Sequence, residues 1–257
     1  MAIPNKLRGS GRVWVRVFAS FVGLVGIVWG FHLLPMFWNE ELPARVASKL
    51  LQGQPFKAPI LEEQVSALEA KEPSFCSPTR LRILLVLQLK LLSTTNSSSD
   101  EGGAAATEEE LYDTARAALR CTPADSISWL VLFWLDVKAH GLQPKDVNYL
   151  RMSYAFGPHE GWIALWRNSM SILVLPRLPD DLKNEVLDEF AKLVDTGQLY
   201  QQTVAIFVSA PPAVRARIVE KLRVANSIPR QFFAKDLYDR GIDVDLPGVG
   251  KPTRPWQ

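Results

Sequence analysis

The stretch that decides the fold is residues 116–168, which contains ALRCTPADSISWLVLFWLDVKAHG (118–141) and QPKDVNYLRMSYAFGPHEGWIALWRN (143–168). It holds two junctions of the form x–Pro–x–acid, at Pro123 and Pro158, which lie 35 residues apart. Each junction follows a run with apolar residues at helical spacing and opens a second apolar run that carries tryptophan. A repeat near this length is typical of stacked helical hairpins, because one hairpin alone cannot bury its apolar face. The sequence therefore predicts an all-α fold built from repeated helix pairs.

The chain around this stretch divides into four predicted helical hairpins. They pair residues 79–92 with 107–120, 124–140 with 144–156, 159–175 with 179–196, and 198–209 with 211–224. The strongly apolar segment 79–92 is expected to be covered on most sides. Thr107 and Glu110 have the spacing of a capping box, which predicts that a helix starts at Thr107. The polar, Gly-bearing segment 93–106 is expected to be a flexible loop, and 229–240 a terminal capping helix.

The junction at Pro123 resembles the junction between repeats of the tetratricopeptide type. That pattern has a small residue five positions before a proline, with tryptophan and leucine six and nine positions after it. The matching residues here are Ala118, Pro123, Trp129 and Leu132. Phe133 and Asp136 depart from the pattern, because they stand where the family has a small residue and a tyrosine. The resemblance covers about residues 79–225 and implies an α-solenoid of about four antiparallel hairpins.

Residues 13–38 form an almost continuous apolar stretch near the N-terminus. About 20 helical residues at a rise of about 1.5 Å span the hydrocarbon core of a bilayer. Trp29 and Trp38 lie toward the far end, as interfacial aromatic residues do, and Arg16 can extend its guanidinium to the near interface. The sequence therefore predicts a single transmembrane anchor over 13–38, preceded by a short N-terminal segment, 1–12.

Charge gives this anchor an orientation. Residues 1–38 contain the basic residues Lys6, Arg8, Arg12 and Arg16, and no acidic residue precedes Glu40. By the positive-inside rule, residues 1–12 are expected in the cytoplasm and residues 39–257 in the periplasm of a bacterial inner-membrane protein. A cleaved signal peptide is the first alternative, but bulky and acidic residues follow the apolar stretch where a small-x-small cleavage site would be needed. A soluble protein with a buried N-terminal helix is the second alternative.

The composition of the remaining chain excludes one class of partner. The whole protein has 29 basic and 27 acidic residues and a net charge of +2. Residues 1–38 hold four of the basic residues and none of the acidic ones. The remaining residues, 39–257, therefore have a slightly negative net charge. Phosphate binding needs a concentrated basic face, so nucleic acid is not expected as a partner.

The segments that flank the hairpins have their own patterns. Residues 39–78 are expected to form a neck with two short helices, 43–52 and 59–71, because each begins with proline. Residues 79–240 form the expected hairpin domain. Residues 241–257 are rich in proline and glycine and are expected to form an extended tail.

The two cysteines lie just outside the helices of the first predicted hairpin. Cys76 precedes the helix at 79–92, and Cys121 follows the helix at 107–120. If these helices pack antiparallel, their outer ends lie level and the two cysteines become neighbours. An oxidising compartment then favours a disulfide, and two buried free thiols are the alternative.

The sequence contains two partial motifs for metal or phosphate binding, and neither is complete. His159 and Glu160 begin a sequence like the HExxH motif of zinc proteases, but Ile163 occupies the position of the second histidine. The run GVGK (248–251) lacks the residues that a phosphate-binding loop requires. No pattern predicts a metal site or a cofactor, and the protein is not expected to be an enzyme.

A dense group of aromatic and polar residues is the candidate binding surface. It comprises Tyr154, His159, Glu160, Trp162, Trp166, Arg167 and Asn168. Aromatic faces with amide and guanidinium donors can line a groove for a sugar or a peptide. The alternative is that the tryptophans belong to the core between hairpins, and that Arg167 pairs with an acid and holds two hairpins in register.

The anchor, the neck and the motif LRMSYAFGPHEGWIALWRN together are similar to small inner-membrane proteins of alphaproteobacteria linked to exopolysaccharide or O-antigen assembly. The expected function is a membrane-anchored scaffold or accessory subunit of an envelope complex. Its expected partners are the bilayer, other envelope proteins and, from the resemblance alone, polysaccharide. A cell-wall glycosidase that uses Glu160 and a periplasmic chaperone-type adaptor are the alternatives.

Overall fold

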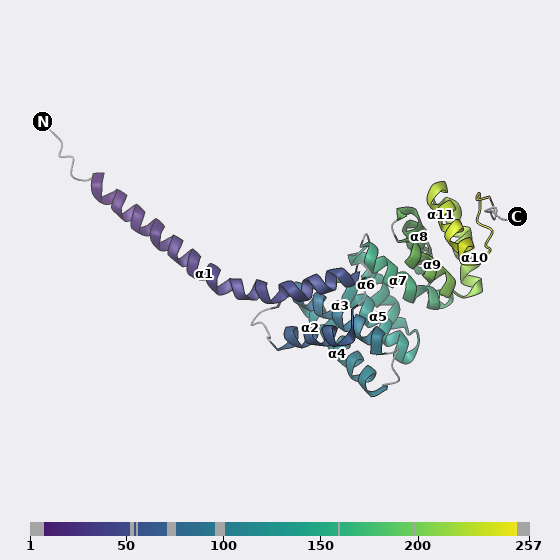
Figure 1. Ribbon diagram of the computed structural model, residues 1–257, viewed down its shortest axis with the longest axis horizontal. Helices are drawn as coiled ribbons and strands as arrows, with labels where there is room; N and C mark the ends of the chain where they lie inside the picture. The colour runs from purple at the N-terminus through teal and green to yellow at the C-terminus, as the bar shows by residue number, and fades with distance from the viewer. Residues whose placement is uncertain are drawn as a thin grey trace.

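The protein is all-helical in the part of the chain that the structure describes. The computed structural model describes the backbone except at residues 1–7, 52–53, 55, 71–75, 96–100, 159, 198 and 251–257, and it gives no side chains for 8–12, 32–40, 94–95 and 101–106. The α-helices are α1 (Arg8–Leu51), α2 (Ala58–Glu69), α3 (Pro78–Thr95), α4 (Glu101–Cys121), α5 (Ser126–His140), α6 (Pro144–Phe156), α7 (Gly161–Val174), α8 (Asp180–Thr196), α9 (Tyr200–Ser209), α10 (Pro212–Lys221) and α11 (Ser227–Asp239) (Figure 1). Two 3₁₀ turns, η1 (Leu175–Arg177) and η2 (Leu222–Val224), follow α7 and α10. No strand occurs among the described residues, which confirms that the fold is all-α.

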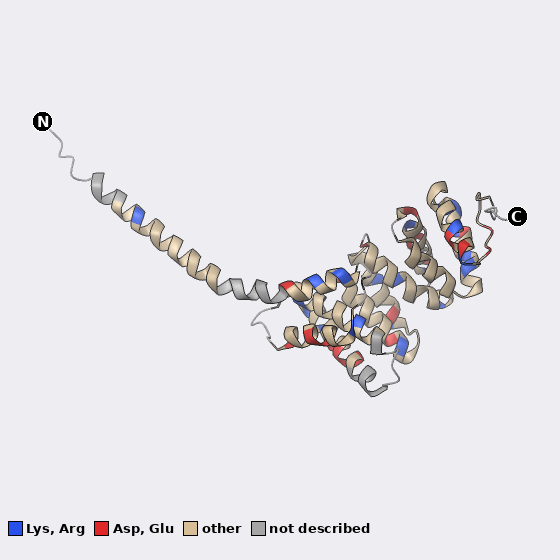
Figure 2. Ribbon diagram, viewed as in Figure 1, with Lys and Arg blue, Asp and Glu red and all other residues tan. Residues whose placement is uncertain are grey.

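Helix α1 is one long helix that projects from the body and bends partway along its length (Figure 1). Its segment Val13–Phe31 is long and apolar enough to cross a membrane, with a mean hydropathy of 1.8, and it makes no buried contact with the body. In the sequence Arg16 is the one charged residue of this segment, and Figure 2 shows the segment mostly in tan. Trp29 is exposed as well, and the side chain of Trp38 lies outside the described residues.

The expected separate helix at 43–52 is wrong, because α1 continues without a break to Leu51. Pro43 lies inside α1 and its side chain is buried. A proline removes one helical hydrogen bond and can bend a helix without ending it where the turns on both sides are held. Val46 and Ala47, one turn further on, are buried against α2 and α3. Their packing stabilises the part of α1 that follows Pro43.

Helix α3 lies between two apolar clusters, as its composition predicted. One of its faces, with Leu84 and Leu87, packs against α1 and α2. The opposite face, with Leu85, Leu89 and Leu92, belongs to the main core. Helix α2 contributes Leu61, Val65 and Leu68, the apolar stripe visible in the sequence.

Helix α4 begins six residues earlier than its capping-box pattern predicts. It starts at Glu101, so that Thr107 lies within the helix and not at its N-terminus. The added segment is EGGAAA, in which three alanines favour a helix and two glycines disfavour it, so helix propensity alone does not explain the earlier start. The predicted loop 93–106 is therefore shorter than expected.

The junction at Pro123 is built by local hydrogen bonds. Asp125 caps α5, because its carboxylate accepts from Ser128 N at 3.2 Å. The indole of Trp129 donates to the carbonyl of Pro123 at 2.7 Å. At the other end of α5, Gly141 has a φ of +70°, which allows the chain to leave the helix at low steric cost.

Consecutive helices pack closely through most of the body. The close pairs are α3 with α4, α5 with α6, and α7 with α8, and in addition α5 contacts both α3 and α7. The C-terminal part differs from the expected fourth hairpin, since α10 packs on α8 and α11 packs on α8 and α9. Residues 241–250 have no helix, yet Leu246 is buried in the main core. This part of the predicted tail is therefore held against the body, and 251–257 lies outside the described residues.

Candidate functional site

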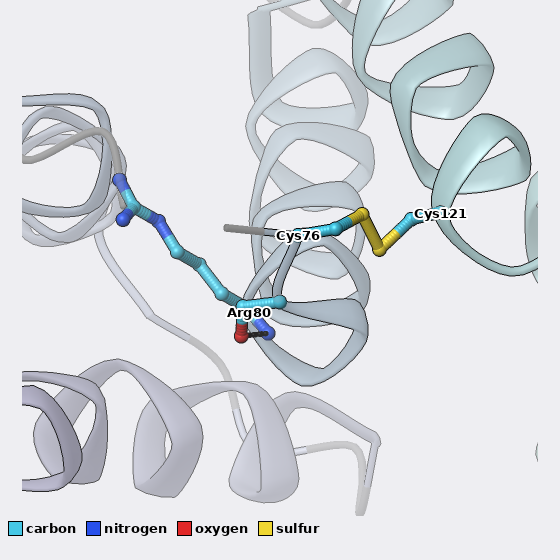
Figure 3. The surroundings of a disulfide bond; sticks show 4 residues. Cys76, Arg80 and Cys121 are labelled. Atoms are coloured by element: carbon cyan, nitrogen blue, oxygen red, sulfur yellow. Dashed lines mark hydrogen bonds between the residues drawn. A yellow bond between two sulfur atoms is a disulfide. The ribbon is translucent and has the colours of Figure 1, made fainter. Parts of the chain in front are cut away.

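The predicted disulfide is present in the structure. Cys76 and Cys121 are bonded, with 5.7 Å between their Cα atoms (Figure 3). The bond joins the residue two positions before α3 to the last residue of α4. Because these two helices also pack on each other, the bond confirms that they run antiparallel. In Figure 3 the side chain of Arg80 points away from the sulfur atoms.

Arg167 forms the centre of a buried polar cluster. Its side chain on α7 is fully enclosed. The Nε atom donates to both carboxylate oxygens of Glu189 on α8 at 3.1 Å, and Nη2 donates to Glu189 as well. Nη1 donates to the carbonyl of Ser153 at 2.8 Å, and Nη2 donates to the carbonyl of Gly157 at 3.1 Å. The guanidinium thus joins α8 to the C-terminal end of α6.

Glu189 is shared by two further side chains. Asn168 Nδ2 donates to its Oε2 at 2.6 Å, and the hydroxyl of Tyr154 donates to the same atom at 3.2 Å. The Tyr154 ring lies 4.1 Å from the guanidinium carbon of Arg167. Burial raises the pKa of the Glu189 carboxyl, and the hydrogen bonds and charge of Arg167 partly offset this rise. Burial also raises the pKa of Tyr154 well above its ordinary value.

We call Arg167, Glu189, Asn168 and Tyr154 the structural lock, because their contacts link α6, α7 and α8. The structure brings together Tyr154, Arg167 and Asn168, with Arg167 and Asn168 buried and Tyr154 partly buried. Arg167 pairs with an acid across two helices, which is the alternative that the sequence left open. Sequence reasoning missed Glu189 as the acid. Its position gave a signal, because it lies three residues after the buried Val186 and four before the buried Leu193 on α8.

The other predicted site residues are dispersed. Glu160 lies at the start of α7, partly exposed, with its carboxylate 3.9 Å from Arg82. Arg82 binds Asp125 more closely, at 2.7 Å, so Glu160 lies at the edge of a surface ion network. Trp162 packs against both apolar clusters, and His159 lies outside the described residues. Glu160 therefore does not lie in the enclosed setting that a glycosidase acid requires.

An apolar groove is the first candidate functional site. It has a volume of about 560 Å³ and is formed by α3, α5 and α7. Its lining residues are Leu89, Ser93, Phe133, Trp134, Val137, Lys138, Trp166, Ser169, Met170, Leu173 and Val174. Leu89 and Phe133 are buried, whereas Leu173 is 57% exposed. The ammonium of Lys138 lies 5.6 Å from the Trp134 ring and pairs with Glu108 of α4.

A second, more polar pocket of about 520 Å³ lies between α9 and α11. Its lining residues are Tyr200, Gln201, Gln202, Phe232, Lys235, Asp236 and Asp239. Sequence reasoning found neither pocket as a unit, although it named Trp166. Within the described ranges, no three His, Cys, Asp or Glu side chains gather closely enough to hold a metal ion.

Replacing Gly157 by alanine is expected to destabilise the domain by about 1–3 kcal/mol through overpacking. A Cβ atom at this position would lie 2.3 Å from Ser126 Oγ. That hydroxyl donates to the carbonyl of Ser153 at 2.7 Å, so moving it disturbs the polar cluster. Urea denaturation of the variant measures the effect. Gly161→Ala is the matched control, because the nearest side-chain atom there is 3.9 Å away, and equal stability of both variants would contradict the close contact.

The comparisons with known proteins place the chain in no group. No protein-family model matches the sequence, no curated protein matches it, and no solved structure matches the fold.

Proposed function

We propose that this protein is a single-pass membrane-anchored scaffold of the bacterial envelope, whose periplasmic body is a tetratricopeptide-like α-solenoid. Its groove binds the apolar face of a helix from another envelope protein. The observation that carries this proposal is the groove between α3, α5 and α7. These are the first helices of three successive pairs, and in a solenoid such helices line one continuous face.

The lining of the groove suits one occupant. An amphipathic helix places apolar side chains at i, i+3, i+4 and i+7, and it binds by seating them in an apolar trough. Trp134, Trp166, Met170 and Leu173 supply aromatic and flexible apolar contacts of this kind. Lys138 is the cation among the lining residues, and it keeps 39% of its side chain exposed while paired with Glu108. The partner helix is therefore expected to carry an acidic residue beside its apolar face that shares this ammonium with Glu108.

The anchor determines where the partner must be. Between Phe31 and Val46 the helix α1 advances about 22 Å at 1.5 Å per residue. The body is then held within a short distance of the bilayer, which raises its effective concentration for other membrane-bound proteins. The basic residues ahead of the anchor favour a cytoplasmic N-terminus, and the disulfide suits an oxidising periplasm. A role in the assembly or export of surface polysaccharide is supported by the sequence resemblance alone.

Site-specific crosslinking in intact cells tests the groove. A photoreactive amino acid at Leu173 is expected to crosslink to another envelope protein, and mass spectrometry should map the crosslink to an amphipathic helix with an acidic residue. The same amino acid at Val224 is the control, because Val224 is 77% exposed and lies outside the groove. Crosslinking to lipid, to a second copy of the chain, or with equal yield at both positions would contradict the proposal.

The mapped helix then provides a quantitative prediction. Leu173→Asp is expected to weaken binding of the corresponding synthetic peptide by about tenfold or more, because a charge replaces an apolar contact at the groove rim. Val224→Asp is expected to leave the affinity unchanged. Isothermal titration with the full-length protein in lipid nanodiscs measures both values, and equal affinity of the two variants would contradict helix binding in the groove.

A further inference from the structure

The pocket between α9 and α11 combines an aromatic pair, one partly buried and one exposed, with hydrogen-bonding groups. The rings of Tyr200 and Phe232 lie 6.3 Å apart at an angle of 44°. Phe232 is 57% exposed, whereas the adjacent Phe233 is buried in the main core. The hydroxyl of Tyr200 donates to the carbonyl of Pro229 at 3.3 Å, which holds its ring against the start of α11. The Phe232 ring is therefore held beside Tyr200 and exposed to solvent at the pocket.

The polar groups around this ring face are of two kinds. Gln201 and Gln202 are exposed on the first turn of α9. Their side-chain amides form no hydrogen bond with another described residue. Asp239 pairs with Lys235 at 2.6 Å, and Asp236 lies 3.2 Å from Arg240. The amides offer donors and acceptors, and each paired carboxylate keeps oxygen lone pairs that can accept further hydrogen bonds.

The charges of the pocket limit the class of ligand. Its lining residues include one cation, Lys235, which is already paired with Asp239, so an anionic ligand would find no free cation in the lining. A cationic ligand would have to compete with Lys235 and Arg240, which already bind these two carboxylates. An uncharged ligand with an apolar face and many hydroxyls meets neither obstacle.

We propose that this pocket binds a neutral oligosaccharide. The C–H face of a sugar ring packs on Phe232, and its hydroxyls exchange hydrogen bonds with Gln201, Gln202 and the paired carboxylate of Asp239. The site shares no residue with the groove. It goes beyond the proposed scaffold function, and each can fail without the other.

A binding experiment on the full-length protein in lipid nanodiscs tests this site, since nanodiscs avoid detergents with sugar headgroups. A panel of neutral hexasaccharides with glucose, galactose, mannose or N-acetylglucosamine units is titrated and followed by saturation-transfer NMR. At least one member is expected to bind saturably. Phe232→Ala is expected to weaken that binding about tenfold, because the aromatic contact is lost. Ile228→Ala is the matched control, as Ile228 is 64% exposed one turn earlier on α11 and does not line the pocket.

Asp239→Asn is the second variant, which tests the carboxylate as a hydrogen-bond acceptor for the sugar. It keeps an oxygen acceptor, so binding of the neutral sugar is expected to fall by less than with Phe232→Ala. Parallel titrations use a lysine- and arginine-rich octapeptide and a sulfated hexasaccharide. Tighter binding of either one than of every neutral sugar overturns the proposal, as does absence of saturable binding across the neutral panel. Equal affinity of Phe232→Ala and Ile228→Ala for the sugar also overturns it.

Discussion

Replacing Arg167 by methionine is expected to lower the free energy of unfolding by about 3–5 kcal/mol. The variant leaves Glu189 buried without its cation, and it removes the donors to the carbonyls of Ser153 and Gly157. A buried unpaired charge costs more than the lost contacts themselves, because the carboxylate gives up water and gains no cation in return. Urea denaturation followed by far-UV circular dichroism measures the change.

The double variant Arg167→Met with Glu189→Leu separates charge from packing. Removing both ions is expected to recover most of the lost stability, since an apolar pair of similar volume often replaces a buried ion pair at little cost. Arg151→Met is the matched control. It breaks an ion pair with Asp181 that lies exposed on the surface, so only a small change is expected. If Arg167→Met were no more destabilising than Arg151→Met, the buried cluster would not be a structural lock.

Replacing Cys121 by serine is expected to destabilise the oxidised protein by about 4 kcal/mol in the chain-entropy account of disulfides. The bond closes a loop with a sequence separation of 45 residues and holds the start of α3 beside the end of α4. Without it, the unfolded chain gains conformational freedom that the intact bond denies. The measurement compares urea denaturation of both proteins with and without dithiothreitol.

The reductant provides the control for this prediction. Dithiothreitol is expected to lower the stability of the unmodified protein to that of Cys121→Ser, and to leave Cys121→Ser itself unchanged. The double variant that also has Cys76→Ser should match the single variant. A reductant that leaves the unmodified protein unaffected would show that the bond does not form or does not stabilise the fold.

Local patterns in the sequence predicted the helices, the junction at Pro123 and the disulfide. Asp125, Trp129 and Gly141 act through bonds and dihedral angles within a few residues, so their roles can be inferred from spacing. The two cysteines needed one further assumption, the antiparallel packing of neighbouring helices. Two of the errors were also local, because α4 begins before the capping box at Thr107 and Pro43 was accommodated within α1.

The interior partners and the pockets could not be predicted in this way. Arg167 and Glu189 are 22 residues apart and on different helices, and their contact depends on how α7 crosses α8. The sequence of α7 is compatible with Arg167 facing a solvent-exposed aromatic groove or facing the interior. The rotation of α7 about its own axis decides between these two arrangements. The apolar groove likewise requires three helices from separate pairs to meet, which no single stretch encodes.

A pair of reporter fusions after residue 257 tests the central claim most directly, namely that an anchored helical body lies outside the cytoplasm. Alkaline phosphatase is active only after export, whereas a cytosolic fluorescent protein matures only inside the cell. The account predicts an active phosphatase fusion and a fluorescent-protein fusion that does not fluoresce. Both fusions should be recovered in the membrane fraction. A fluorescent fusion with inactive phosphatase would place the groove and the disulfide in the cytoplasm and contradict the account.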